Sequence, residues 1–126
     1  MLLTTLLMVT GLGIYPPINS VFAGRSKFLV GEQKVSLHVK SNKEALIDMK
    51  GIVNTQGAVK YVVKDDQTID FVFSDAVSKV LKKFKCKIRH ATYNPTNNVA
   101  RVHLHIYNIV SHTMTLHNKN TNMGTS

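Results

Sequence analysis

The chain has 126 residues, of which 44% are hydrophobic and 18% are charged, and it carries a formal net charge of +9. This length fits a single domain, and so high an apolar content excludes an intrinsically disordered chain. The single cysteine, Cys86, excludes an internal disulfide, while the basic balance favours polyanionic partners such as nucleic acid, sulfated glycans or acidic membranes.

The positive charge is concentrated in the second part of the sequence. The first 75 residues hold eight basic side chains and all seven acids, so they contribute +1 of the formal +9. The residues from 76 onward hold eight bases and no acid. We therefore expect an anionic partner to bind this second part of the chain.

Residues 1–23 carry no charged side chain, and residues 2–15 are mostly apolar. Pro16 and Pro17 interrupt this run, and Val21 and Ala23 fit the small-residue pattern that signal peptidases accept. We interpret residues 1–23 as a signal peptide cut after Ala23, which predicts a secreted, extracellular protein. The alternatives are a buried N-terminal segment or a retained hydrophobic anchor, which would make the protein membrane-anchored, although the run is shorter than the roughly 20 residues of a membrane span.

From residue 25 to residue 73, apolar and polar side chains alternate, which is typical of strands with one buried face. Asn54 to Gly57 and the pair Asp65-Asp66 are turn signals between these strands. The pattern predicts five strands, at residues 27–30, 34–40, 45–49, 59–64 and 68–73. Such closely spaced strands indicate an antiparallel barrel or sandwich.

The period then changes to that of a helix. Four apolar side chains follow one another at i, i+3, i+4 and i+7, which predicts a short amphipathic helix over residues 74–84: Val77, Val80, Leu81 and Phe84. Ser74 is expected as its N-cap. Because so short a helix is unstable alone, its apolar face must pack on the sheet or close an open barrel end.

A strongly basic strand is expected over residues 85–93, with Lys83, Lys85, Lys87 and Arg89 on one face. The alternation changes phase near His90, which predicts a β-bulge. Two more strands are expected at residues 99–107 and 110–117. The fold class is therefore mostly β, an antiparallel barrel or sandwich of about eight strands in residues 24–117 with one helix between strands five and six, followed by a polar flexible tail at 118–126.

The bases of the predicted helix and the strands after it form the candidate site for an anionic partner. These residues are Lys79, Lys82, Lys83, Lys85, Lys87, Arg89 and Arg101. Repulsion among like charges on one face would be relieved by a bound polyanion. The alternative is a solvated edge strand whose lysines block pairing with other chains.

The remaining reactive side chains do not predict catalysis. His103 and His105 share a strand face, but no acid or second cysteine lies nearby in the sequence, so we expect no metal and no cofactor. Cys86 is in phase with Phe84 and Ile88, which indicates a buried thiol. The motifs of serine hydrolases, P-loop NTPases, zincins and dinucleotide-binding enzymes are missing from the sequence, and we expect no enzyme.

The inward side chains of such a barrel either fill it or leave a cavity for one small apolar ligand. The candidates for facing an interior ligand are Tyr61, Phe71, Phe73, Leu104 and Met114. Residues 57–63 and 67–73, and the hairpin that runs from residue 93 to residue 106, resemble the lipocalin-like (calycin) meander. This resemblance implies a barrel that binds a small apolar ligand.

The sequence as a whole predicts a non-catalytic secreted binding protein whose basic face binds a glycan, an acidic membrane or nucleic acid. One alternative is a lipocalin-like carrier of a small apolar ligand. The other is a structural subunit of a larger assembly, with Val72, Ile52 and the N-terminal apolar segment as its contact surface.

Overall fold

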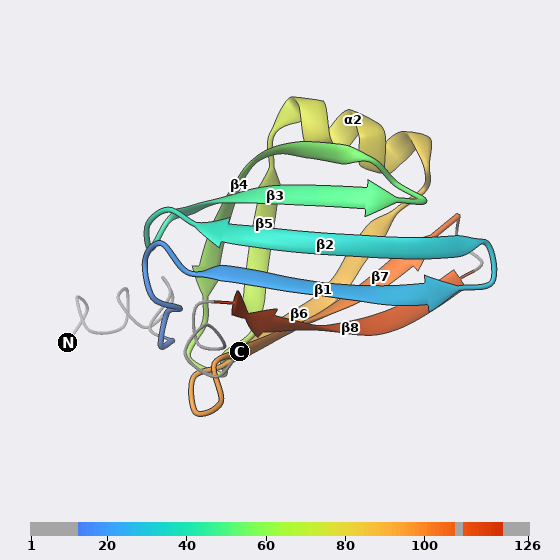
Figure 1. Ribbon diagram of the computed structural model, residues 1–126. Coiled ribbons are helices and arrows are strands. Elements are labelled where there is room, and N and C mark those ends of the chain that lie inside the picture. The colour runs from blue at the N-terminus through green and yellow to red at the C-terminus, as the bar shows by residue number, and fades with distance from the viewer. Residues whose placement is uncertain (1–12, 108–109, 120–126) are drawn as a thin grey trace.

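The computed structural model describes residues 13–107 and 110–119 of the chain. Eight antiparallel strands form one sheet in the order β5-β4-β3-β2-β1-β8-β7-β6, which curls into a nearly closed barrel (Figure 1). The elements are β1 (Val21–Phe28), β2 (Gly31–Val39), β3 (Glu44–Gly51), β4 (Thr55–Val63), β5 (Ile69–Phe73), α2 (Asp75–Lys83), β6 (Lys87–Asn94), β7 (Val99–Ile106) and β8 (Val110–Asn118). The predicted fold class, with one helix between the fifth and sixth strands, is confirmed.

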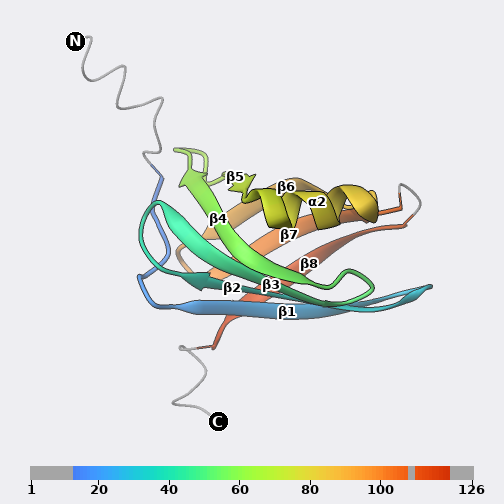
Figure 2. The same ribbon diagram turned by 90° about the horizontal axis from the view of Figure 1, so that it is seen from above.

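The barrel stays open along one seam, between β5 and β6. These strands stand at the two ends of the sheet order, and within the described residues they are joined by the isolated bridge between Thr68 and Thr92. Next to this bridge the Tyr93 amide donates to the carbonyl oxygen of Gln67 over 3.0 Å. Helix α2 lies at the other end of the seam, where β6 begins (Figure 2).

Helix α2 buries the apolar face that the sequence predicted. Val77 and Leu81 are buried, and Val80 and Phe84 pack against the core. The helix approaches β4 closely at Gly57, where an added Cβ would lie 2.7 Å from a methyl carbon of Val77. A side chain at position 57 would therefore push the helix off the barrel.

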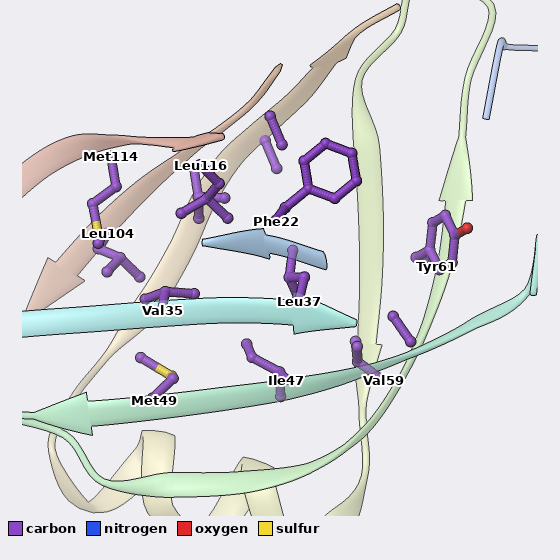
Figure 3. Packing of buried hydrophobic residues seen from close by; sticks show 14 of the residues in the cluster. Phe22, Val35, Leu37, Ile47, Met49, Val59, Tyr61, Leu104, Met114 and Leu116 are labelled. Atoms are coloured by element: carbon purple, nitrogen blue, oxygen red, sulfur yellow. The ribbon is translucent and has the colours of Figure 1, made fainter. Parts of the chain in front are cut away.

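The interior of the barrel is filled with side chains. Alternate residues of neighbouring strands converge on it, among them Phe22, Leu37, Ile47, Leu104 and Leu116 (Figure 3). Leu104 and Leu116 are 0% accessible to solvent, whereas side chains beside a ligand-sized cavity would have area accessible to water. The inward phase that the sequence predicted for β2, β3 and β4 is confirmed, because those residues form the buried cluster.

The N-terminal segment enters the fold earlier than expected. The first strand was predicted at residues 27–30, but β1 is Val21–Phe28. Phe22 is 2% exposed, and its ring meets that of Tyr93 edge to face at 5.8 Å. A cut after Ala23 remains a prediction, and it would divide β1 and remove Phe22 from the core. The earlier part of the apolar run, residues 1–12, lies outside the described residues.

Two other boundaries differ from the predicted ones. The turn expected over residues 54–57 falls earlier in the chain. The Asn54 side chain accepts a hydrogen bond from the Gly51 amide and donates one to the Gly51 carbonyl oxygen. Strand β4 already begins at Thr55. At the other end, β8 continues to the buried residue Asn118, which was assigned to the tail. Residues 120–126 lie outside the described residues. Of the part of the chain that the structure describes, no helix has the length and apolarity to cross a membrane.

The start of the basic strand was also predicted wrongly. Residues 85 and 86 do not continue a strand; they end α2 in a Schellman motif. The Cys86 amide donates to the Leu81 carbonyl over 2.7 Å, and the Lys85 amide donates to that of Lys82 over 3.0 Å. Lys85 has a φ of 48°, a left-handed conformation in which glycine is the usual residue. Strand β6 consequently begins at Lys87.

The first prediction tests whether Phe22 belongs to the core. Phe22→Ala should lower the free energy of unfolding by about 3–5 kcal/mol, because it removes a fully buried ring. Phe71→Ala, at a partly buried position on β5, should cost less. Urea unfolding followed by circular dichroism measures both. A loss of unfolding free energy for Phe22→Ala that is equal to or smaller than the loss for Phe71→Ala would show that β1 does not seal the barrel.

The second prediction concerns the left-handed residue at the end of α2. Lys85→Gly should raise the free energy of unfolding by about 0.5–1 kcal/mol, because relief of the left-handed strain exceeds the entropy that glycine adds to the unfolded chain. The matched control is Lys83→Gly in the last helical turn, which should lower stability by about 1 kcal/mol. Urea unfolding of the two variants should give opposite signs, and equal signs would contradict the Schellman geometry.

Candidate functional site

A hollow of about 730 Å³ lies at the seam, between the end of β5, α2 and the first half of β6. We call it the seam groove. Its lining consists of Phe73, Ser78, Leu81, Lys82, Lys85, Cys86, Lys87, Ile88 and Arg89. The apolar side chains among these form a floor that continues the barrel core, and the cations form a rim around it.

The rim combines four cations, each from a different kind of local structure. Lys82 lies in the last turn of α2, Lys85 occupies the left-handed position of the Schellman motif, and Lys87 begins β6. Arg89 is the extra residue of a bulge, because Ile88 pairs with Leu104 while His90 pairs with His103. The predicted bulge near His90 is therefore confirmed, and it directs Arg89 to the groove.

The structure brings together only part of the predicted basic face. Lys82, Lys85, Lys87 and Arg89 line the groove. The other predicted residues, Lys79, Lys83 and Arg101, are exposed but do not line it, and the Nζ of Lys83 lies 6.0 Å from the ring centroid of Phe84. The expectation of one strand face was wrong, because the helix extends through Lys83 and a turn follows it.

The rim cations have no acidic partners in the described residues. The ion pairs there are Lys50 with Asp48, at 4.0 Å, and Lys64 with Asp70, at 3.3 Å. The first pair lies on β3, the second joins β5 to the residue after β4, and none of the four residues lines the seam groove. The positive potential of the seam groove is therefore not neutralised within this part of the protein, and it would attract a negatively charged ligand.

Histidines of β6 and β7 lie next to the cationic rim. The rings of His103 and His105 lie 5.6 Å apart, and His90 is paired with His103 across the strands. Partial desolvation, together with the charges of Arg89, His103 and Lys87, lowers the pKa of His105. His117 pairs with Val99 at the far end of β7, so it does not join this group. Among residues 13–107 and 110–119, no group of three or more His, Cys, Asp or Glu side chains is placed to hold a metal ion.

Cys86 is part of the floor of the seam groove, and its buried position was predicted correctly. The side chain is 5% exposed, and burial raises the pKa of its thiol to about 11. The thiol is therefore protonated at neutral pH and serves as an apolar surface rather than as a nucleophile.

The residues proposed to face an interior ligand instead fill the barrel or lie at its seam. Leu104, Met114 and Tyr61 are buried, and the Tyr61 hydroxyl donates to the Ser41 carbonyl over 2.7 Å. Phe71 and Phe73 are partly buried and stack at 5.8 Å between ring centroids. Phe73 is the one of these five that lines the seam groove.

Sequence reasoning found the cations of the rim but missed the floor between them. The available signal was the apolar face of the helix, which ends at Leu81 shortly before the apolar residues Cys86 and Ile88 of the next segment. Only the turn between the helix and β6 places these residues side by side with Phe73 of β5.

The fold defines the protein as an eight-stranded antiparallel β-barrel with a helix at its open seam, an architecture that is compatible with a lipocalin-like barrel. Comparison of the chain with protein-family models, with curated proteins and with solved structures found no match.

The third prediction tests the electrostatic coupling on this surface. Arg89→Ser should raise the pKa of His105, because Arg89 is the neighbouring charge that lowers this pKa most. Arg101→Ser, on the same strand as His105, is the matched control and should leave the pKa unchanged, since Arg101 does not contribute to the shift. An NMR titration of the imidazole resonances measures both values. A rise in the Arg101 variant alone would contradict the described placement of Arg89.

Proposed function

We propose that this protein is a non-catalytic binding protein that holds an anionic amphiphile, such as an acidic membrane lipid, in the seam groove. The observation that carries the proposal is the pairing of an apolar floor with a rim of four cations in one hollow: Lys82, Lys85, Lys87 and Arg89. Secretion remains a prediction from the N-terminal residues, and it would place this groove at an extracellular surface.

The two parts of the groove select a ligand that has both characters. A basic side chain close to an anionic lipid surface contributes about 1 kcal/mol to binding. Each buried methylene of an acyl chain contributes about 0.8 kcal/mol. Four cations alone would attract any anion, and the floor alone would attract any apolar molecule. A ligand with a negative head group and an acyl chain gains from both contributions at once.

The floor also distinguishes among the anionic partners that the charge allows. A glycan chain or a nucleic acid backbone has no hydrocarbon to cover Leu81 and Ile88. Proteins that bind single-stranded nucleic acid stack successive bases on aromatic rings. The described lining of the seam groove includes one aromatic residue, Phe73. Acidic lipids therefore fit the groove better than the other two classes.

The packing of the barrel interior favours the seam groove as the ligand site. The lipocalin-like resemblance implies a ligand inside the barrel, but Leu104 and Leu116 are fully buried there by other side chains. An interior ligand would have to displace a packed core, at a cost in stability. A ligand in the seam groove needs no such rearrangement.

The chemistry of the lining supports binding without catalysis. Cys86 is held as a neutral thiol, and the hydroxyl of Ser78 is directed to the carbonyl oxygen of Phe73, at 3.5 Å. The described lining includes no His, Asp or Glu that would act as a general base. The groove therefore offers charge and apolar surface but no activated nucleophile.

The fourth prediction tests the rim. Replacement of Lys82, Lys85, Lys87 and Arg89 together by Ser should weaken binding to vesicles containing phosphatidylglycerol by about 100-fold or more, because four cations are lost. Vesicle co-sedimentation at low and at physiological salt measures the affinity. The matched control replaces Lys27, Lys40, Lys43 and Lys60, which are exposed and outside the groove lining, and removes the same charge.

Two further variants separate stability and apolar contact from charge. Lys85→Gly should bind these vesicles less tightly than the parent although its fold is more stable. Ile88→Thr, at a partly buried position of the floor, should weaken binding to vesicles but not to inorganic phosphate.

An equal loss of vesicle binding in the rim variant and its matched control would reduce the effect to net charge and refute the seam groove as the binding site. Unchanged vesicle binding in the rim variant would do the same.

A further inference from the structure

A second hollow, of about 1090 Å³, lies on the outer face of β3, β2, β1 and β8. We call it the four-strand groove. Strand β1 is central in the sheet order and the seam joins its two ends, so the two grooves lie on opposite sides of the barrel. The strands that form most of it run side by side in Figure 1.

A row of three cations crosses this groove at right angles to the strands. Arg25 of β1 is paired directly with Lys34 of β2, and Lys34 is paired directly with Lys50 of β3. Side chains that are directly opposite in an antiparallel pair have Cβ atoms about 5 Å apart, and like charges at that distance destabilise the sheet. Two such like-charge pairs in one row are a cost that a bound anion would remove.

The acidic residues nearby do not neutralise this row. Asp48 lies in the groove, but its carboxylate is 4.0 Å from the Nζ of Lys50, a marginal ion pair. Glu32 is paired across the strands with Lys27, further along β1 and β2. Within the described ranges, neither Arg25 nor Lys34 forms an ion pair.

The floor of the four-strand groove is made of small residues, several of them with hydroxyl groups. Ala23, Ser36 and Thr115 line it, and the close approach of β1 to β8 requires Gly24. A Cβ added at Gly24 would lie 2.3 Å from the carbonyl oxygen of Thr115. On the β8 side the lining continues with His117 and Lys119, so the row of three cations is joined by a fourth cation, Lys119, from another part of the lining.

We propose that the four-strand groove binds a sulfated glycan chain. Its cations would pair with sulfate groups, with the guanidinium of Arg25 suited to a bidentate contact. The hydroxyls of Ser36 and Thr115 would bond to the sugar between the sulfates. This site is independent of the seam groove, because its residues come from other strands and its floor carries hydroxyl groups.

The lining argues for a glycan over the other large anions. Proteins that bind single-stranded nucleic acid stack its bases on aromatic rings, and the described lining contains no Phe, Tyr or Trp. A lipid would require an apolar floor for its chains, as in the seam groove. A hydroxyl-rich chain with regularly spaced sulfates matches both the cations and the floor.

The experiment measures binding of a heparin octasaccharide to the full chain by isothermal titration calorimetry at physiological salt. Arg25→Ser with Lys34→Ser should weaken this binding at least tenfold and reduce its dependence on salt. The matched control, Lys27→Ser with Lys40→Ser, removes two exposed cations outside the lining and should change the affinity less than threefold. The melting temperature of the groove variant, Arg25→Ser with Lys34→Ser, should be no lower than that of the parent, because the variant loses a like-charge pair. Thermal melting therefore verifies that the variant is folded.

Two crossed measurements separate this proposal from the function proposed for the seam. The groove variant should keep its binding to phosphatidylglycerol vesicles, and the rim variant of the seam should keep at least half of its affinity for the octasaccharide. Loss of octasaccharide binding in the rim variant but not in the groove variant would overturn the inference. So would a parent protein that does not bind the octasaccharide, or an equally tight complex with single-stranded DNA.

Discussion

The packing of α2 against the barrel is the interaction on which the other features depend. In the described part of the chain, one isolated bridge joins the segments of β5 and β6, so the core between these strands needs a cover. Val77 and Leu81 provide it, and Gly57 permits the helix to approach β4 closely enough for Val77 to be fully buried. A barrel with eight fully paired strands would have no seam and no seam groove.

The turn at the end of α2 forms part of the seam groove. The Schellman motif reverses the chain over Lys85 and Cys86, burying the thiol and exposing the lysine. The bulge at Arg89 then adds a cation to the same rim. Lys85 adopts a left-handed conformation that glycine would adopt at lower cost, and its side chain lies on the rim of the seam groove.

The two grooves show that the overall charge balance of a chain segment does not describe its surface. The first 75 residues are nearly neutral, yet the fold aligns Arg25, Lys34 and Lys50 across three strands. Asp48 is the one acid in the described lining of this groove, whereas Asp70 pairs with Lys64 just beyond the end of β4. Under the two proposals, the cationic surfaces on opposite sides of one small barrel would let the protein hold a lipid surface and a glycan chain at the same time.

The sequence by itself determined the eight-strand fold class, the helix and the inward residues of β2, β3 and β4, because alternation and helical spacing record which side chains avoid water. It also located the bulge near His90 and the cations Lys82, Lys85, Lys87 and Arg89. The tertiary structure alone decided which strands are neighbours. The seam, its apolar floor and the row from Arg25 to Lys50 join residues that are distant in the chain, and register between strands is not encoded in the local pattern of any one of them.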